Sequence, residues 1–434
     1  MQTVIRVDGD LDELNEYLIS LHVQRIMLVC GNSIKYLRYD PYFSDLYRST
    51  GIRVVRFSGF EPNPRYESVA EGVRMFKEEN CDMIIAAGGG SAIDVAKCIK
   101  AFAYMDNNKE TPGDNNAKPE DGMEVTYLSR EIVPNDIPLM AIPTTAGTGS
   151  EVTRFAVIYY KGEKQSVSDR SIIPSAAVLD SSVLEKLPLY QKKATMLDAF
   201  CHAVESYWSV NSTDESKEYS REAIRLILHN VNGYLGENII DGTAEFSGIQ
   251  SGEDIGGTEG TDSKADRDVC VDKDDIKEVP RPKNKGYNDN MQQAAYLAGK
   301  AIDITQTTAG HAMCYKLTSL YGIAHGHAAA ICVAGLFPYM LEHVDDCIDS
   351  RGKEYLQSTF NELMEALGIG SAALVGSFFD RLIERLGISI PVADEKDYAV
   401  LKRSVNTERL RNNPVKLTED AIERIYRSIL SHSK

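Results

Sequence analysis

The stretch MIIAAGGGSAIDVAK, at Met83–Lys97, indicates the fold class more directly than any other part of the chain. An apolar run of strand length ends in three glycines, Gly88–Gly90, and a helical pattern follows at once. Without Cβ atoms these glycines let a phosphate approach the backbone, and the helix start presents free N–H groups. Ser91 adds a hydroxyl donor, and Asp94 can cap the helix or accept hydrogen bonds from backbone amides. The stretch predicts a phosphate-binding turn or a plain strand–helix turn, without the GxGxxG fingerprint.

Further apolar runs of strand length surround this stretch and alternate with amphipathic helical patterns at Tyr66–Glu78 and Ala92–Tyr104. Buried strands that alternate with helices predict a parallel α/β sheet. The runs are Val23–Cys30, Ile52–Ser58, Met83–Ala87, Pro138–Ile142, Phe155–Tyr160 and Ala176–Leu179.

A second polar turn, PTTAGTGSE at Pro143–Glu151, directly follows the strand-like run Pro138–Ile142. Its threonines and glycines place hydroxyl and amide donors at the carboxyl end of a strand, where α/β sheets bind their ligands. A polar turn without a ligand is the alternative. Two such turns in one sheet favour a dinucleotide site.

The second half of the chain shows helical periodicity almost throughout. We therefore expect an α/β domain over residues 1–182 and an all-α domain over residues 183–434. The predicted helices are Lys192–Ser209, Ser216–Leu235, Asp289–Thr305, His327–His343, Glu354–Leu367 and Ser371–Leu386.

Two segments have the composition of loops. Asp106–Gly122 is rich in Asn, Asp, Gly and Pro, which predicts a surface excursion. Phe246–Asn288 is an acidic insertion with few apolar residues, and this composition is typical of disordered or loosely packed chain. The alternative for the insertion is an interaction loop or a lid over the site.

Composition and charge describe a globular enzyme of the cytoplasm. The 434 residues carry a net charge of −17, which argues against a nucleic-acid partner. The eight cysteines form no CxxC motif, so neither a disulfide framework nor a thiolate zinc site is indicated. The first residues are acidic where a signal peptide would be basic, and no apolar run reaches the about 18 residues of a membrane span.

Asp198 and His202 stand four residues apart in the helical stretch TMLDAFCHAVESYW, at Thr195–Trp208. This spacing places a carboxylate and an imidazole on one face of a helix, where they can share a cation. A hydrogen-bonded pair without a metal is the alternative. The flanking residues are apolar, and burying Asp and His without a partner is costly.

Three of the chain's eight histidines, His311, His325 and His327, lie within the glycine-punctuated stretch Thr307–Ala330. A helix–loop–helix would bring His311 and His325 to the face that carries Asp198. One Asp and three His form a set of nitrogen and oxygen ligands that suits Fe(II) or Zn, and not Ca or Mg.

Together these stretches resemble the iron-containing (group III) alcohol dehydrogenase family, over most of the chain from Val23 onward. The motifs that carry the resemblance are GGGSAIDVAK at Gly88–Lys97, PTTAGTGSEVTRFAVI at Pro143–Ile158, LDAFCHAVESYWS at Leu197–Ser209 and HAMCYKLTSLYGIAHG at His311–Gly326.

The resemblance implies a nucleotide-binding α/β domain and a helical metal-binding domain, with the site between them, in subunits that form dimers or larger assemblies. The implied reaction is direct hydride transfer between a nicotinamide cofactor and a small aldehyde or alcohol. The implied metal ligands are Asp198, His202, His311 and His325. The implied cofactor contacts are Gly89, Gly90, Ser91, Asp94, Thr144, Thr145, Thr148, Asn63 and Lys164.

The cofactor preference depends on the residues after the first predicted strand of the sheet. Family members that favour NADH often carry an Asp there, which repels a 2′-phosphate. Val29–Ser33 is VCGNS, without an acid, so we expect NADPH to be accepted as well as NADH.

The chain departs from the family at two candidate catalytic positions. Tyr315 stands where many members have a histidine of the proton relay, and His327 stands where an aliphatic residue is usual. We expect His327 to take over proton transfer or to contact an anionic substrate group; the alternative is that it caps its helix.

At Tyr315 and His327 the chain resembles the branch of the family that reduces phosphonoacetaldehyde or sulfoacetaldehyde. This resemblance predicts a small anionic aldehyde as the substrate. Short alcohols or diols are the alternative substrates. A relative of the dehydroquinate synthase or glycerol-1-phosphate dehydrogenase type, and a non-enzymatic assembly protein, are the alternative classes.

Overall fold

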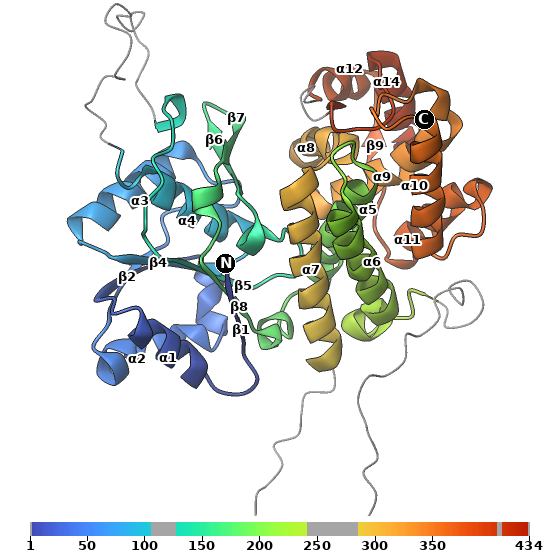
Figure 1. Ribbon diagram of the computed structural model, residues 1–434. Coiled ribbons are helices and arrows are strands. Elements are labelled where there is room, and N and C mark those ends of the chain that lie inside the picture. Colours follow the sequence, from blue (N-terminus) through green and yellow to red (C-terminus); the bar gives the residue numbers. More distant parts are fainter. Residues whose placement is uncertain (1, 106–126, 241–284, 406–409, 433–434) are drawn as a thin grey trace, which may run out of the picture.

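The computed structural model describes residues 2–105, 127–240, 285–405 and 410–432 (Figure 1). The predicted loop Asp106–Gly122 and most of the predicted insertion Phe246–Asn288 lie outside these residues. The last part of that insertion was assigned wrongly, because a helix already begins at Lys285.

The N-terminal part contains a parallel sheet, as the sequence predicted, with six strands in the order β1-β8-β5-β4-β2-β3. The strands are β1 Thr3–Arg6, β2 Arg25–Cys30, β3 Arg53–Phe57, β4 Met83–Gly88, β5 Leu139–Pro143 and β8 Ala176–Leu179. The helices that cover it are α1 Asp12–Ser20, α2 Tyr39–Thr50, α3 Tyr66–Glu78 and α4 Gly90–Phe102.

Helices cover both faces of the sheet (Figure 1). Along β2, Ile26 and Leu28 pack into the core that includes α1 and α2, whereas Met27 and Val29 pack into the core that includes α3 and α4. Alternate residues of a strand point to opposite faces, so a strand buried on both faces reads as a continuous apolar run.

The direction in which the chain winds changes between β2 and β4. β3 lies on one side of β2, and the chain then returns so that β4 and β5 lie on the other side. At such a switch point the loops after the two strands diverge and leave a crevice at the carboxyl ends, where open α/β sheets bind ligands. The glycines at the end of β4 stand at this switch point.

An antiparallel hairpin, β6 Phe155–Tyr160 and β7 Glu163–Ser168, forms a separate two-stranded sheet. The predicted run Phe155–Tyr160 is therefore a strand, but it is not part of the parallel sheet. The hairpin is fixed at both ends: Val157 N–H donates to Asp94 Oδ2 at 3.0 Å, and Tyr159 N–H donates to the carbonyl of Pro64 at 2.8 Å.

The C-terminal part is helical apart from one short two-stranded sheet within the described residues, formed by β9 Val392–Ala393 and β10 Ser431–His432. The helices are α5 Leu189–Trp208, α6 Asp214–Leu235, α7 Lys285–Thr305, α8 Ala309–Tyr321, α9 His325–Glu342, α10 Lys353–Ala366, α11 Val375–Arg385, α12 Glu395–Arg403 and α14 Glu419–Ile429. The predicted domain boundary near residue 182 stays a prediction.

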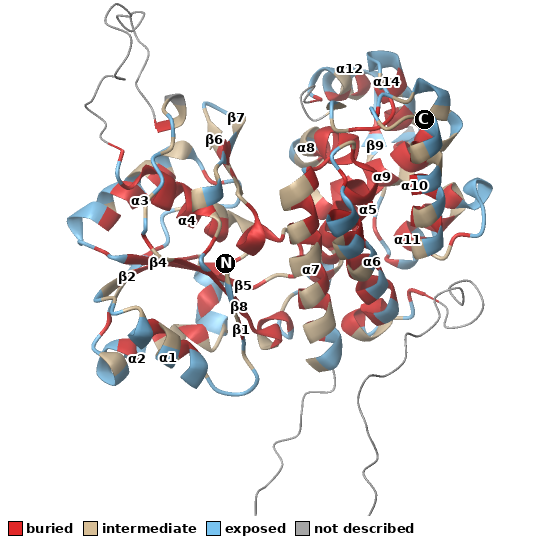
Figure 2. Cartoon of the chain, viewed as in Figure 1, coloured by how far each residue is buried: buried red, intermediate tan, exposed pale blue. Residues whose placement is uncertain are grey.

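Helix α5 lies at the centre of this helical part and is buried at every residue from Met196 to Trp208 (Figure 2). A helix that is buried all round belongs to the core, and polar residues on it need partners inside the protein.

Among the described residues, none of the helices combines the length and the apolar character needed to cross a membrane.

Candidate metal and cofactor site

One face of α5 carries three buried ionisable side chains. Asp198, His202 and Glu205 stand at i, i+4 and i+7, so they line up along the helix, and at most 6% of each residue is exposed. The apolar residues of α5 pack into the hydrophobic core of the helical part. The face with Asp198, His202 and Glu205 is therefore a polar surface inside the protein.

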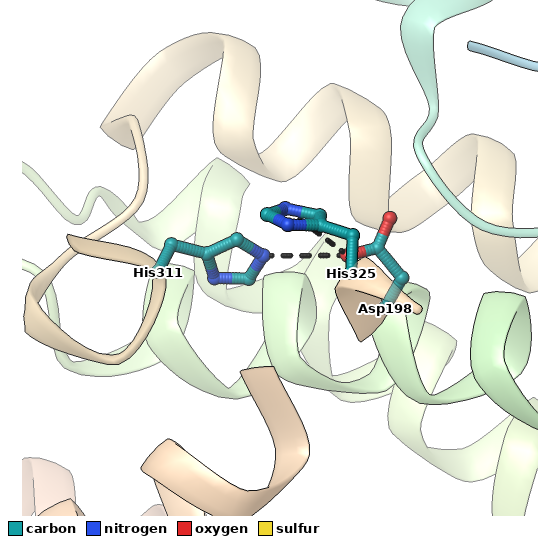
Figure 3. Close-up of side chains that lie close together, drawn as sticks. All are labelled: Asp198, His311 and His325. Atoms are coloured by element: carbon teal, nitrogen blue, oxygen red, sulfur yellow. Dashed lines mark hydrogen bonds and ion pairs between the residues drawn. The ribbon is translucent and has the colours of Figure 1, made fainter. Parts of the chain in front are cut away.

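The neighbouring helices add two more imidazoles to this face. His311 lies in the first turn of α8, and His325 is the first residue of α9 (Figure 3). Asp198 Oδ1 lies 3.4 Å from Nε2 of His311 and 3.9 Å from Nε2 of His325. Nε2 of His202 lies 4.0 Å from the same oxygen.

These separations fit ligands that share a cation. Four ligand atoms in a tetrahedron with bonds of about 2.1 Å lie about 3.4 Å from one another. The ligand atoms of Asp198, His311 and His325 all lie within 4.8 Å of one another, and the rings of His202 and His311 stack at 4.5 Å. One carboxylate with imidazoles is a donor set for Fe(II) or Zn.

Two glycines permit the close packing that brings these ligands together. A Cβ on Gly326, next to His325, would lie 2.0 Å from the carbonyl oxygen of Ala194, so α9 contacts α5 backbone to backbone. A Cβ on Gly310, next to His311, would lie 2.9 Å from Glu205 Oε1. At Gly326 a side chain would require α5 to move, whereas at Gly310 it would displace the side chains of Val333 and Glu205.

Glu205 orients His311, and the sequence interpretation missed it. Its Oε2 pairs with Nδ1 of His311. Its Oε1 accepts hydrogen bonds from Thr308 Oγ1 at 2.5 Å and from the backbone N–H of His311 at 3.2 Å. A carboxylate on the far nitrogen of a metal-binding histidine fixes the ring and its tautomer.

The charges of the cluster favour a cation. Burial alone would raise the pKa of Asp198, but the imidazoles around it hold that pKa well below its usual range. Burial opposes the charge of His311, but Glu205 and Asp198 outweigh it and raise the pKa of His311 to about 9. Two buried carboxylates thus favour a positive charge between them, which a proton on His311 or a divalent metal would supply.

The other two histidines of the cluster are suited to bind as neutral ligands. Burial lowers the pKa of His202 to about 4, against the opposite effect of Asp198. The side chain of His325 is 38% exposed but surrounded on most sides, and this desolvation lowers its pKa to about 3. A neutral imidazole keeps a lone pair for a metal.

The glycine turn stands at the N-terminus of α4, and the second polar turn packs against it. Thr144 N–H donates to the carbonyl of Gly88 at 3.0 Å. A Cβ on Gly90 would lie 2.8 Å from Thr148 Cγ2, and a Cβ on Gly89 would lie 3.4 Å from Thr145 Oγ1.

Most of the predicted cofactor contacts remain accessible at this turn. Gly89, Gly90, Ser91, Thr145 and Thr148 are partly exposed, whereas Thr144 is buried. Backbone amides at a helix start, with hydroxyls beside them, can bind a pyrophosphate.

Asp94 is partly exposed, but both of its carboxylate oxygens accept hydrogen bonds from the protein. Its Oδ1 accepts a hydrogen bond from Ser150 Oγ at 2.7 Å, and its Oδ2 accepts the bond from Val157 described above. Lys97, one turn further along α4, donates to Ser150 Oγ at 3.0 Å. Asp94 therefore joins the glycine turn, the second turn and the hairpin.

The second turn also joins the two parts of the molecule. A Cβ on Gly147 would lie 2.8 Å from Thr195 Cβ in α5, and a Cβ on Gly149 would lie 2.4 Å from Gly299 Cα in α7. Gly149 adopts a left-handed conformation with φ 61°. The second polar turn, which together with the glycine turn forms the candidate cofactor turn, therefore packs directly against the helices that surround the cluster of Asp198 and the histidines, the candidate metal cluster.

Lys164 lies at the interface between the two parts. Its Nζ is 3.2 Å from the centre of the Tyr315 ring in α8, and that ring stacks on His325 with 5.4 Å between the ring centres. Asn63, the other predicted contact outside the turns, is an exposed residue with φ 59° in the loop that supports the hairpin.

His327 points away from the metal cluster. Its Nε2 lies 2.9 Å from the carbonyl of Ser389, so this nitrogen donates, and its Nδ1 is left to accept from Tyr190 Oη at 3.0 Å. The Tyr190 hydroxyl in turn accepts from the N–H of Ala324, just before α9. These contacts fix the start of α9 and lend no support to the predicted proton transfer by His327.

A dinucleotide-type sheet packed against a largely buried cluster of one carboxylate and three imidazoles defines a metal-dependent, nucleotide-linked oxidoreductase. The sequence profile described as iron-containing alcohol dehydrogenase matches residues 2–181. The C-terminal profile of the Fe-containing alcohol dehydrogenase family matches residues 192–240 and 271–430. The chain belongs to the iron-containing alcohol dehydrogenase family, as its motifs predicted.

Relatives in this family have different substrates. Phosphonoacetaldehyde reductase from Streptomyces viridochromogenes is 26% identical, over 92% of this chain and 89% of the relative. A 1,3-propanediol dehydrogenase from Klebsiella pneumoniae is 30% identical, over 73% of this chain and 68% of the relative.

Solved structures share the fold. Sulfoacetaldehyde reductase from Bifidobacterium kashiwanohense, in complex with NAD+, is similar with a TM-score of 0.74 and 21% identity, over 99% of this chain and 97% of the other. An iron-containing alcohol dehydrogenase from Thermotoga maritima gives a TM-score of 0.72 and 24% identity, over 99% and 98% of the two chains.

Proposed function

We propose that the protein is a metal-dependent, NAD(P)H-linked reductase of a small anionic aldehyde that carries a phosphonate or sulfonate group. The observation that carries the proposal is the arrangement of three imidazole Nε2 atoms within 4.0 Å of Asp198 Oδ1, packed against the cofactor turn. Relatives named for phosphonate and sulfonate aldehydes support the substrate class.

In the proposed reaction an aldehyde, NAD(P)H and a proton give an alcohol and NAD(P)+. Asp198, His202, His311 and His325 would hold a divalent metal, which would supply Lewis acidity for the carbonyl group. A bound dinucleotide would supply the hydride for the carbonyl carbon, and the oxygen would take up the proton. Gly89, Gly90, Ser91, Thr145 and Thr148 are proposed to hold the dinucleotide.

Several finer assignments belong to the same proposal. Fe(II) is the proposed metal, with Zn as the alternative, because the donor set suits both. NADPH is proposed to serve as well as NADH, since no acid stands in Val29–Ser33. We also propose a cytoplasmic homodimer or larger homo-oligomer.

The test is a substrate comparison with protein loaded anaerobically with Fe(II), and in parallel with Zn. Oxidation of NADH and NADPH is followed with phosphonoacetaldehyde, sulfoacetaldehyde and propanal, and reduction of NAD+ with 1,3-propanediol. We expect the highest kcat/KM with one of the anionic aldehydes. A higher value with propanal or 1,3-propanediol would contradict the anionic class, in favour of the diol dehydrogenase relatives.

A further inference from the structure

The hairpin β6–β7 brings a positive charge to the metal cluster from the other part of the molecule. Lys164 Nζ lies 3.2 Å from the centre of the Tyr315 ring, which is close for an ammonium over an aromatic face. The same ring lies nearly parallel to His325, with an angle of 10° between the planes. Lysine, tyrosine and a predicted metal ligand are thus in successive contact.

The supports of the hairpin fix the position of Lys164. Tyr159 stands directly opposite Lys164 in the register of the hairpin, and its N–H is bonded to the loop that contains Asn63. The hairpin is also bonded to Asp94 on α4. A side chain on a strand with such supports is placed more accurately than one on a free loop.

The charge of Lys164 affects the pKa values of two nearby groups, His325 and Asp94. Burial is the main cause of the low pKa of His325, and the Lys164 ammonium lowers that pKa further. At Asp94, burial raises the pKa and Lys164 is among the charges that oppose the increase. The contact that places the ammonium is the one with the Tyr315 ring, which stacks on the partly exposed His325.

We propose that Lys164 receives the anionic group of the substrate and that Tyr315 positions it for this role; the inference rests on the proposed function. An ammonium beside the cluster attracts the phosphonate or sulfonate while the aldehyde group is held at the metal. A tyrosine ring is a better support for a cation than the histidine common at this position, which can itself be charged. Tyr315 would therefore tune the site toward anions.

A second lysine of the same hairpin provides a matched control. Lys161 Nζ lies 5.0 Å from the centre of the Tyr160 ring, and Lys161 is exposed. Lys161→Met removes the same charge from the hairpin as Lys164→Met, without touching the stack on His325.

The measured quantity is the ratio of kcat/KM for sulfoacetaldehyde to kcat/KM for propanal. We expect Lys164→Met to lower this ratio by about 10- to 100-fold, as for loss of a hydrogen bond to a charged group. In Lys164→Arg we expect most of the wild-type ratio to return. Tyr315→Leu should lower the ratio by a smaller factor than Lys164→Met, and Tyr315→Phe should keep the wild-type ratio because the aromatic ring remains. Lys161→Met leaves the ratio at the wild-type value.

A binding measurement gives a readout that does not depend on turnover. We expect 2-hydroxyethanesulfonate to bind the protein loaded with metal and NAD+ about tenfold or more weakly after Lys164→Met, measured by calorimetry. If the wild type reduces no aldehyde, the proposed function fails, and this titration still decides whether Lys164 binds the anion. An equal loss with both aldehydes, or a weaker affinity for NADPH at an unchanged ratio, would overturn the inference and assign Lys164 to the dinucleotide.

Discussion

The cofactor turn and the metal cluster lie against each other but are built in opposite ways. The turn consists of backbone amides and small side chains from two short stretches, each directly after a strand. The cluster consists of carboxylate and imidazole side chains from α5 and from the later helices α8 and α9, and Asp198 and His311 are 113 residues apart in the chain. The turn therefore depends on local conformation, and the cluster depends on helix packing and on the balance of buried charge.

The largest effect is expected at the carboxylate that the three imidazoles share. Asp198→Asn keeps the shape but removes the charge, so metal content should fall toward zero. The kcat/KM should then fall by roughly 1000-fold or more, because Lewis-acid stabilisation amounts to several kcal/mol. Metal analysis and steady-state rates measure both.

The affinity of this variant for NADPH, measured by fluorescence titration, is the control. It should stay within about threefold of the wild type if the turn is built locally. A loss of NADPH binding in step with the metal would show that the two regions are not independent.

A smaller effect is expected at Glu205, which contacts His311 and lies behind the cluster. Glu205→Gln keeps the bond from Thr308 but loses the charge that holds the His311 ring. Metal affinity should fall by about 10- to 100-fold, as is usual for such supporting groups. Competition with a chelator of known affinity measures it.

The matched control is Glu222→Gln, at a partly exposed glutamate on α6 that pairs with Arg225. It makes the same chemical change away from the cluster and should leave metal affinity at the wild-type value. Equal metal affinities of the Glu205 variant and the wild type would show that Glu205 does not support the metal site.

The smallest effect is expected at the cofactor turn. In Gly90→Ala the new methyl group meets the end of Thr148, a side chain that can rotate. The Kd for NADPH should rise about five- to tenfold, at the low end of the cost of overpacking, and metal content should not change. Gly286→Ala, at a position with open space, is the control. An unchanged Kd would mean that phosphate does not approach this part of the backbone.

Much of the fold follows from local patterns. The predicted strand Phe155–Tyr160 and helix Tyr66–Glu78 have the observed bounds, because a continuous apolar run defines the strand and helical apolar spacing defines the helix. The strand β7 was missed because its sequence, EKQSVS, is polar and lies outside the main core. Nothing in these six residues shows that they pair with β6.

For the site, spacing within one helix was more informative than spacing between helices. Asp198 and His202 follow from an i, i+4 pattern, and extending the same face by one turn would have found Glu205. The partners of His327 on Tyr190 and Ser389 lie far away in the sequence, so no local pattern could place them. The Lys164–Tyr315 contact likewise depends on how the hairpin meets α8.

The contact at Gly326 has a consequence for how such sequences evolve. The two histidines of the HGH triplet at His325–His327 serve opposite sides of one helix start, and the glycine between them sets the distance to α5. His327 can be exchanged wherever another residue secures the start of α9, whereas exchange of His325 requires a new ligand. Gly326 can change only if α5 itself moves, so among relatives the glycine should vary less than the second histidine.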